Sequence, residues 1–174
     1  MTDTEIIENL QSKLAVQVGR HLYGVLGSYK TLDAFAAKLR QAKMLDGQHF
    51  PEPLSVNRGI LEDIPDDEFR TLVKNEAKMP APTAAHVARS FDLFLRSRLA
   101  DHGLVVLANL EMLFAYRVEL NTLRTLAADN YQVVLLLPGK RDRSRIAMFP
   151  DAVDGSYTIP SNLIAENHLW ELTA

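Results

Sequence analysis

The sequence predicts a single α/β domain over residues 1–174, with a mainly parallel sheet and helices on both of its faces. Two observations predict it. The run 104–107 and the run 133–137 of an expected strand 132–137 are continuously apolar, as in strands buried on both faces of a parallel sheet, and a helix expected at about 118–128 separates them. A strand, a turn and a helix within residues 21–44 add a third parallel strand near the start of the chain.

The other elements follow from apolar spacing and from turn residues. A short amphipathic helix is expected to open near Thr4, and a longer helix is expected from Thr83 to its stop at Gly103. The dipeptide Pro138-Gly139 is expected to end the strand that precedes it. Short strands are predicted at 54–56, 146–149, 157–159 and 168–172, whereas 57–82 fits only a short helix and the acidic turn 65–68.

Composition excludes several classes of site. The chain has no cysteine, which rules out disulfides, thiolate zinc sites and cysteine nucleophiles, and its five histidines lack metal-ligand spacing, so we expect no metal site. A net charge of −3 gives no reason to expect nucleic acid or an anionic membrane as a direct partner. Residues 1–13 lack the pattern of a signal peptide, and the longest apolar run is too short to cross a bilayer, so we expect a cytoplasmic protein.

The segment 24–31, Gly-Val-Leu-Gly-Ser-Tyr-Lys-Thr, resembles a P-loop, G-x-x-x-x-G-K-[ST], between a strand and a helix. In such a loop backbone amides cradle phosphates, the lysine reaches the terminal ones and the hydroxyl binds magnesium. The motif predicts a P-loop NTPase-like three-layer fold in which ATP with magnesium is the candidate cofactor. The residues assigned to the nucleotide are Gly24, Gly27, Ser28, Lys30 and Thr31.

Tyr29 stands where a P-loop has its second glycine. A bulky residue resists the backbone angles that glycine adopts freely, and its ring would crowd the phosphate. A second interpretation places the strand at 21–26 and shortens the loop to 27–29, which is too tight for a triphosphate. The sequence leaves both open.

The end of the apolar run 104–107 is the second place to test for nucleotide chemistry. A P-loop NTPase holds its magnesium there with an acidic residue, and this chain has Ala108, followed by Asn109 and Glu111. Asn109 is a candidate nucleotide contact and Glu111 a candidate catalytic residue that polarises water. Alternatively, Asn109 makes a strand-end turn and Glu111 favours the dipole of a helix N-terminus.

Three segments together resemble BrxF, the P-loop protein of bacterial phage-exclusion (BREX) defence systems. They are Pro53-Leu-Ser-Val-Asn57, the stretch Val105–Phe114 with Asn-Leu-Glu-Met-Leu-Phe, and Val133–Gly139, in the family's order. The resemblance implies a role in phage defence, with other defence proteins and a larger ATPase as partners and nucleic acid met only through the complex. It carries over Gly24, Lys30, Thr31, Asn109 and Glu111, and it fails at Tyr29 and Ala108.

The stretch Lys140–Arg145 holds four basic residues within six positions, beyond a buried strand. Ligands of open parallel sheets bind outside the carboxyl ends of strands, so an arginine here is a candidate phosphate contact. A solvated loop explains the stretch equally simply.

Three functions are compatible with these residues: an interaction subunit with weak or lost nucleotide binding, an active small NTPase, and a small-molecule kinase. The kinase requires an intact phosphate loop, which Tyr29 opposes, and the NTPase requires a metal ligand that Ala108 cannot supply. The sequence therefore favours the interaction subunit with little or no NTPase activity.

Overall fold

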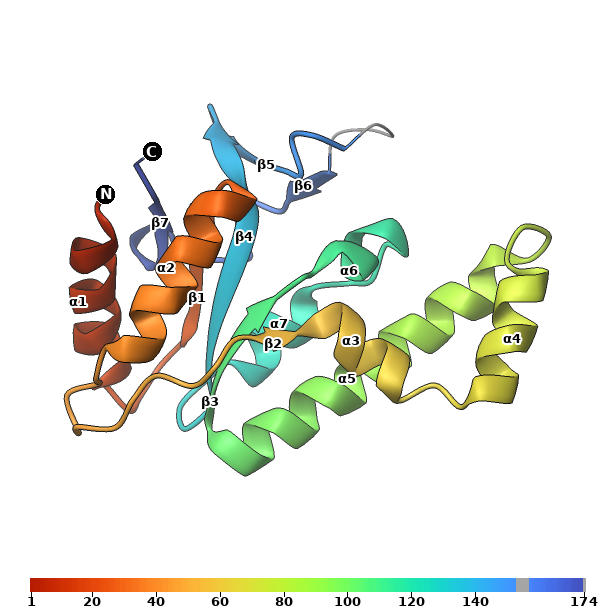
Figure 1. The fold of residues 1–174 in the computed structure, drawn as a ribbon, viewed down its shortest axis with the longest axis horizontal. Coiled ribbons are helices and arrows are strands. Elements are labelled where there is room, and N and C mark those ends of the chain that lie inside the picture. Colours follow the sequence, from red (N-terminus) through yellow and green to blue (C-terminus); the bar gives the residue numbers. More distant parts are fainter. Residues whose placement is uncertain (153–156, 174) are drawn as a thin grey trace.

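The computed structural model describes residues 1–152 and 157–173, and its central feature is a sheet of five parallel strands (Figure 1). The strand order is β2-β3-β4-β1-β7. All four pairings between these strands are parallel, which confirms the predicted α/β class with a mainly parallel sheet. The strands are β1 (Leu22–Gly27), β2 (Leu54–Ser55), β3 (Leu104–Ala108), β4 (Gln132–Asp142) and β7 (Leu169–Glu171).

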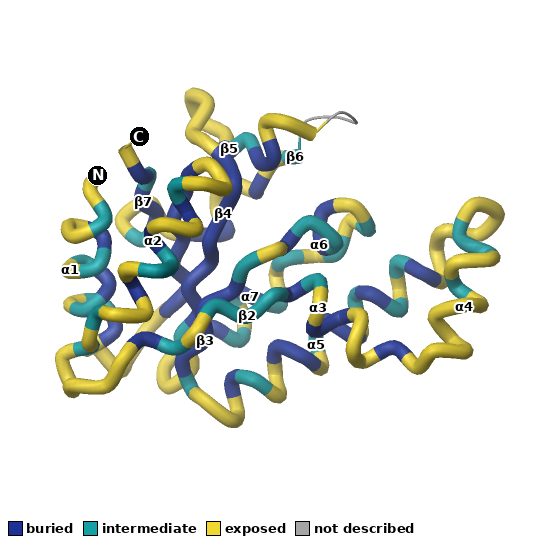
Figure 2. The backbone as a smooth tube through the Cα atoms, viewed as in Figure 1, coloured by how far each residue is buried: buried dark blue, intermediate teal, exposed yellow. Residues whose placement is uncertain are grey.

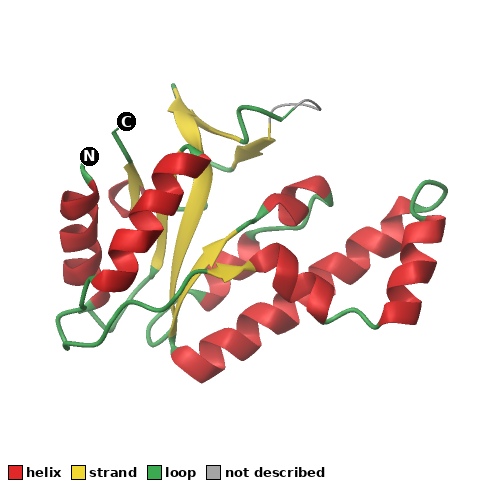
Figure 3. Ribbon diagram, in the orientation of Figure 1, coloured by secondary structure: helices red, strands yellow, loops and turns green. Residues whose placement is uncertain are grey.

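Helices cover both faces of the sheet (Figure 3). The helices α1 (Asp3–Leu14) and α2 (Tyr29–Gln41) contribute to one apolar core, which includes Tyr23 and Val25 of β1. The opposite core holds Leu22 and Leu26 of the same strand, because side chains alternate across a strand. Its helical residues come from α3 (Val56–Glu62), α5 (Pro80–His102), α6 (Glu111–Ala115) and α7 (Asn121–Leu126).

Local residues explain where the main helices begin and end. Thr2 and Glu5 form a capping box at the start of α1, in which each side chain bonds the other residue's backbone N–H. The helix α5 begins at Pro80, three residues before the expected Thr83, because proline is favoured in a first helical turn. It ends at Gly103, whose φ of 71° suits glycine.

The structure corrects the expected end of β4. The strand continues through Pro138-Gly139 to Asp142 and pairs antiparallel with β5 (Arg145–Met148), which pairs with β6 (Tyr157–Ile159). Gly139 permits this because a Cβ there would lie 2.5 Å from the Ala147 carbonyl oxygen. The basic stretch 140–145 is therefore a β-hairpin and not a solvated loop.

Two helical expectations are also corrected. The predicted helix at 118–128 is only α7, preceded by the short α6 and a connecting segment. The segment 57–82 contains most of α3 and a separate helix, α4 (Asp66–Asn75). A 3-10 turn, Glu166–His168, leads into β7.

The helix α4 and the start of α5 project away from the sheet (Figure 1). No residue of α4 is buried, and the tube coloured by burial is largely exposed along it (Figure 2). The exposed apolar side chains here are Phe69, Val73 and Met79. The helix α4 therefore gains little stability from burial of apolar side chains in the core.

Candidate functional site

The carboxyl ends of the parallel strands meet at one edge of the sheet, where ligands of such folds bind. At this edge β1 runs into α2, β2 runs into α3, and β3 ends just before α6. The predicted residues Asn109 and Glu111 therefore lie near the start of α2. The edge is where nucleotide chemistry must be tested.

The connection between β1 and α2 is one residue long. β1 ends at Gly27, α2 begins at Tyr29, and Ser28 between them caps the helix by accepting a hydrogen bond from the Thr31 N–H at 3.2 Å. The loop of eight residues expected from the P-loop motif is not formed. The structure instead has a connection of one residue, which is shorter even than the alternative loop 27–29 that the sequence left open.

Two of the predicted nucleotide-binding residues, Gly24 and Gly27, are consequently packed closely against other side chains of the fold. Gly24 lies inside β1, and a Cβ there would come within 2.8–3.0 Å of side-chain methyls of Leu169, Ile164 and Leu137. A Cβ on Gly27 would lie 2.6 Å from Thr31 Oγ1. Both glycines are thus needed for close packing, and Gly24 does not lie in a loop that faces a ligand.

Thr31 and Lys30 lie in the first turn of α2. The Thr31 hydroxyl donates to the Ser28 carbonyl oxygen at 3.0 Å and lies 3.1 Å from Ser28 Oγ, so it closes the helix turn. Lys30 is exposed. Its ammonium group is therefore open to an incoming anion.

Tyr29 occupies the position of the missing glycine and reaches across the edge to Glu111. Its hydroxyl donates to Glu111 Oε1 at 2.8 Å. Burial, together with the hydrogen bond and negative charge of Glu111, raises the pKa of Tyr29 to about 12. The hydroxyl is therefore protonated at neutral pH and available as a donor.

Asn57, at the start of α3, holds the other side of the same carboxylate. Its Nδ2 donates to Glu111 Oε2 at 2.9 Å, and its Oδ1 accepts from the Met112 N–H at 3.0 Å. Its backbone N–H donates to the Asn109 carbonyl oxygen at 3.1 Å. Both Glu111 oxygens are thus engaged, which leaves the predicted catalytic carboxylate tied into the scaffold.

Sequence reasoning missed these two partners of Glu111. Asn57 was visible only as the end of the Pro-Leu-Ser-Val-Asn segment, and Tyr29 only as a residue that blocks a loop. The available signal was topological, because β2 and β3 pair in parallel and their carboxyl ends must adjoin. Residues just beyond those ends were therefore candidates for contact.

Asn109 has a φ of 53°, in the left-handed region that asparagine tolerates. It lines a small pocket of about 200 Å³ with Tyr29, Asp33, Ser55 and Ala108. Nowhere in residues 1–152 and 157–173 do three His, Asp or Glu side chains gather as metal ligands. The pocket offers polar atoms but little space for a nucleotide.

The basic stretch does not converge on this edge as a group. Arg141 pairs with Glu166 and donates to the Leu169 carbonyl oxygen at 2.9 Å, so it fastens the hairpin to the segment before β7. Lys140, Arg143 and Arg145 are exposed. These three are available to a partner.

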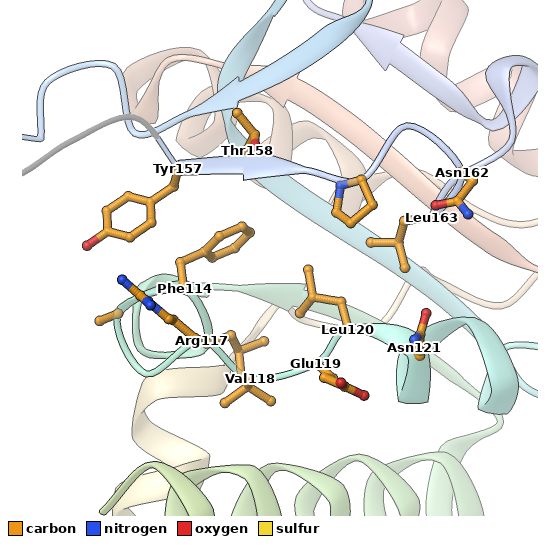
Figure 4. Close-up of a pocket in the computed structure, with 13 residues that line it drawn as sticks. Phe114, Arg117, Val118, Glu119, Leu120, Asn121, Tyr157, Thr158, Asn162 and Leu163 are labelled. Carbon is orange, nitrogen blue, oxygen red and sulfur yellow. The ribbon is translucent and has the colours of Figure 1, made fainter. Parts of the chain in front are cut away.

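A wider groove lies away from the edge, between β6 and the segment that joins α6 to α7 (Figure 4). Its volume is about 650 Å³. Phe114, Leu120 and Leu163 give it apolar walls, and Arg117 and Glu119 lie on the α6–α7 side. The sequence pointed to none of these residues as a site.

Comparison of the chain with protein-family models, with curated proteins and with solved structures gave no match in any of the three. In the part of the chain that the structure describes, every helix is too short or too polar to traverse a bilayer.

Proposed function

We propose that this chain is an accessory subunit of a BREX-type phage-defence system that acts by binding other proteins of that system, including a larger ATPase. It uses a P-loop-like α/β scaffold on which nucleotide binding is weak or lost. The observation that carries the proposal is the one-residue connection between β1 and α2, followed by the Tyr29–Glu111 hydrogen bond. The resemblance at Pro53–Asn57, Val105–Phe114 and Val133–Gly139 supports the assignment to phage defence.

Binding a triphosphate at this edge requires several interactions to be broken together. The first turn of α2 must unwind to lengthen the loop, which removes the Ser28 cap, worth about 0.5–2 kcal/mol. Tyr29 must leave Glu111, and the carboxylate then faces phosphate of like charge. These costs favour a scaffold without nucleotide turnover.

A protein-binding role is supported by the surface of α4. The first turn of this helix carries Asp66, Asp67 and Glu68, and the helix has exposed Phe69 and Val73 farther along. Apolar side chains gathered on an exposed element mark interaction sites, and flanking charge sets orientation. The hairpin residues Arg143 and Arg145 supply a second, oppositely charged surface.

The test is co-purification from cells that express the chain with the other defence proteins. We expect Asp66→Lys with Asp67→Lys, or Arg143→Glu with Arg145→Glu, to release a partner. The melting temperature should stay nearly constant in the hairpin variant, because exposed charges contribute little to folding. It should fall modestly in the α4 variant, because Asp66 and Asp67 lie in the first turn of a helix, whose dipole favours negative charge. Glu8→Lys with Asp101→Lys is the matched control, since both carboxylates are exposed on other helices. Retention of every partner by all variants would contradict a role for these surfaces.

A second test addresses the closed edge. If only Tyr29 and Ala108 blocked an otherwise intact loop, then Tyr29→Gly with Ala108→Asp would restore magnesium–nucleotide binding. Because the connection has one residue, we expect the folded double variant to show no nucleotide-dependent rise in melting temperature. Restored binding would favour the alternative function, a small ATP-binding NTPase of the same system.

A further inference from the structure

A small pocket with two arginines lies away from the Tyr29–Glu111 edge, beside the start of β1. Arg20 and Leu22 line it on one side, Arg124 of α7 on another, and the segment 161–168 before β7 on the third. Its volume is about 170 Å³. The pocket is thus built from three segments that are distant in sequence.

Neither arginine has a partner within residues 1–152 and 157–173. In that part of the chain, no ion pair and no side-chain hydrogen bond involves the guanidinium of Arg20 or of Arg124. Arg124 is partly buried and Arg20 is exposed, and neither guanidinium has a carboxylate within ion-pair distance in that part of the chain. A cation without a counter-charge attracts an anion.

Glu166 is the acidic residue that lines the pocket, and it pairs with Arg141, whose positive charge offsets it. Asp129, whose carboxylate accepts a hydrogen bond from the Gly19 N–H at 3.1 Å, keeps its charge but is not a lining residue of the pocket. His168 also lines the pocket, and burial together with the charge of Lys13 lowers its pKa, so it is neutral at pH 7. Arg20 and Arg124 therefore leave the pocket with an excess of positive charge.

The remaining lining atoms suit an oxyanion. Ser161 offers a hydroxyl and Asn162 an amide, and arginine matches phosphate oxygens through its fork of N–H groups. The volume exceeds the roughly 30 Å³ of one water molecule and falls below the roughly 300–1,000 Å³ of whole-ligand pockets. The pocket therefore fits one charged group.

We propose that this pocket binds a phosphate group through Arg20 and Arg124. Asn162 and Leu163 also line the 650 Å³ groove of Figure 4, so an organic phosphate has room for its remaining atoms beside the bound oxyanion. The site is independent of the proposed interaction function and of the P-loop-like segment. The proposed ligand, a phosphate group, would bind whether or not the edge at Tyr29 and Glu111 is closed.

The experiment is a calorimetric titration of the full chain with inorganic phosphate and with phenyl phosphate, at constant ionic strength, with acetate as the control anion. We expect phosphate to bind with one site per chain and acetate not to bind. Arg20→Gln and Arg124→Gln should each weaken phosphate about tenfold, as loss of a charged hydrogen bond implies. Tighter binding of phenyl phosphate would identify the ligand as an organic phosphate, and equal binding as the free anion.

Three further variants make the titration decisive. Arg58→Gln removes an exposed arginine elsewhere and should leave binding unchanged, whereas Lys30→Ala tests whether the phosphate sits at α2 instead. Arg124→Lys keeps the charge without the fork and should bind between wild type and Arg124→Gln. Should Arg124→Gln fail to fold, the exposed Arg20 still gives the answer. Absence of binding at millimolar phosphate, binding unaffected by Arg20→Gln, or binding abolished by Lys30→Ala would each overturn the proposal.

Discussion

The start of α2 and the helix α4 use their side chains in opposite ways. At the start of α2, Ser28, Thr31 and Tyr29 each bond another group of the protein, and Tyr29 also ties up the carboxylate of Glu111. On α4 no residue is buried, and Phe69 and Val73 remain 41% and 55% exposed. The difference indicates that the polar side chains at the edge mainly hold the fold together here, while the projecting helix keeps apolar side chains exposed to solvent.

The largest expected effect separates the two regions by stability. Phe35 of α2 is fully buried, so Phe35→Ala should lower the free energy of unfolding by about 3–5 kcal/mol through lost burial and a cavity. Phe69→Ala on α4 should change it by no more than about 0.5 kcal/mol. Chemical denaturation of both variants measures the contrast. Similar losses would show that α4 is packed as firmly as α2.

A second prediction tests whether Gly24 is a packing residue. Gly24→Ala should destabilise the protein by about 1–3 kcal/mol, because the added methyl meets Leu169, Ile164 and Leu137. Urea unfolding of the variant and of the wild-type chain measures the difference. If Gly24→Ala were as stable as the wild-type chain, Gly24 would not be a packing residue, and its position in an open loop would be favoured instead.

The Tyr29–Glu111 bond should have a smaller effect. Tyr29→Phe removes the hydroxyl that donates to Glu111, and we expect a loss of about 1 kcal/mol since the side chain is half exposed. Tyr131→Phe is the control, because Tyr131 is similarly exposed and its hydroxyl has no hydrogen bond among the described residues. If the two variants were equally stable, the Tyr29–Glu111 hydrogen bond would not stabilise the fold and would not hold the edge closed.

The smallest expected effect is a dependence of stability on pH. His21 is buried beside Tyr23, whose hydroxyl lies 2.8 Å from its Nδ1, and burial lowers the pKa of His21 below its ordinary value. The unfolded chain then binds more protons than the folded one as pH falls below about 6.5, so stability is complete above that pH and declines below it.

Unfolding free energies measured across pH 5 to 8 check this prediction. The decline should be shallower in His21→Gln, with the contribution of His168 remaining because burial lowers its pKa as well. A steeper decline in the variant would contradict it.

The sequence predicted the sheet better than the site. Apolar runs marked β3 and the first part of β4 because strands buried on both faces have no polar alternation. Gly24–Thr31 fitted two strand–helix boundaries equally, and the choice follows from pairing with β4, where Gly27 lies opposite Pro138. The residues around Gly24–Thr31 do not reveal which residues of β4 they pair with. The role of Asn57 likewise depends on Glu111, 54 positions away.

We propose that the edge at Tyr29 and Glu111 is closed to nucleotide. Thermal unfolding with and without millimolar magnesium–ATP tests it most directly, because a ligand that binds only the folded state stabilises it by RT ln(1 + [L]/Kd). We predict an unchanged melting temperature for the wild-type chain and for Lys30→Ala alike. A rise in the wild-type melting temperature that disappears in Lys30→Ala would contradict the account.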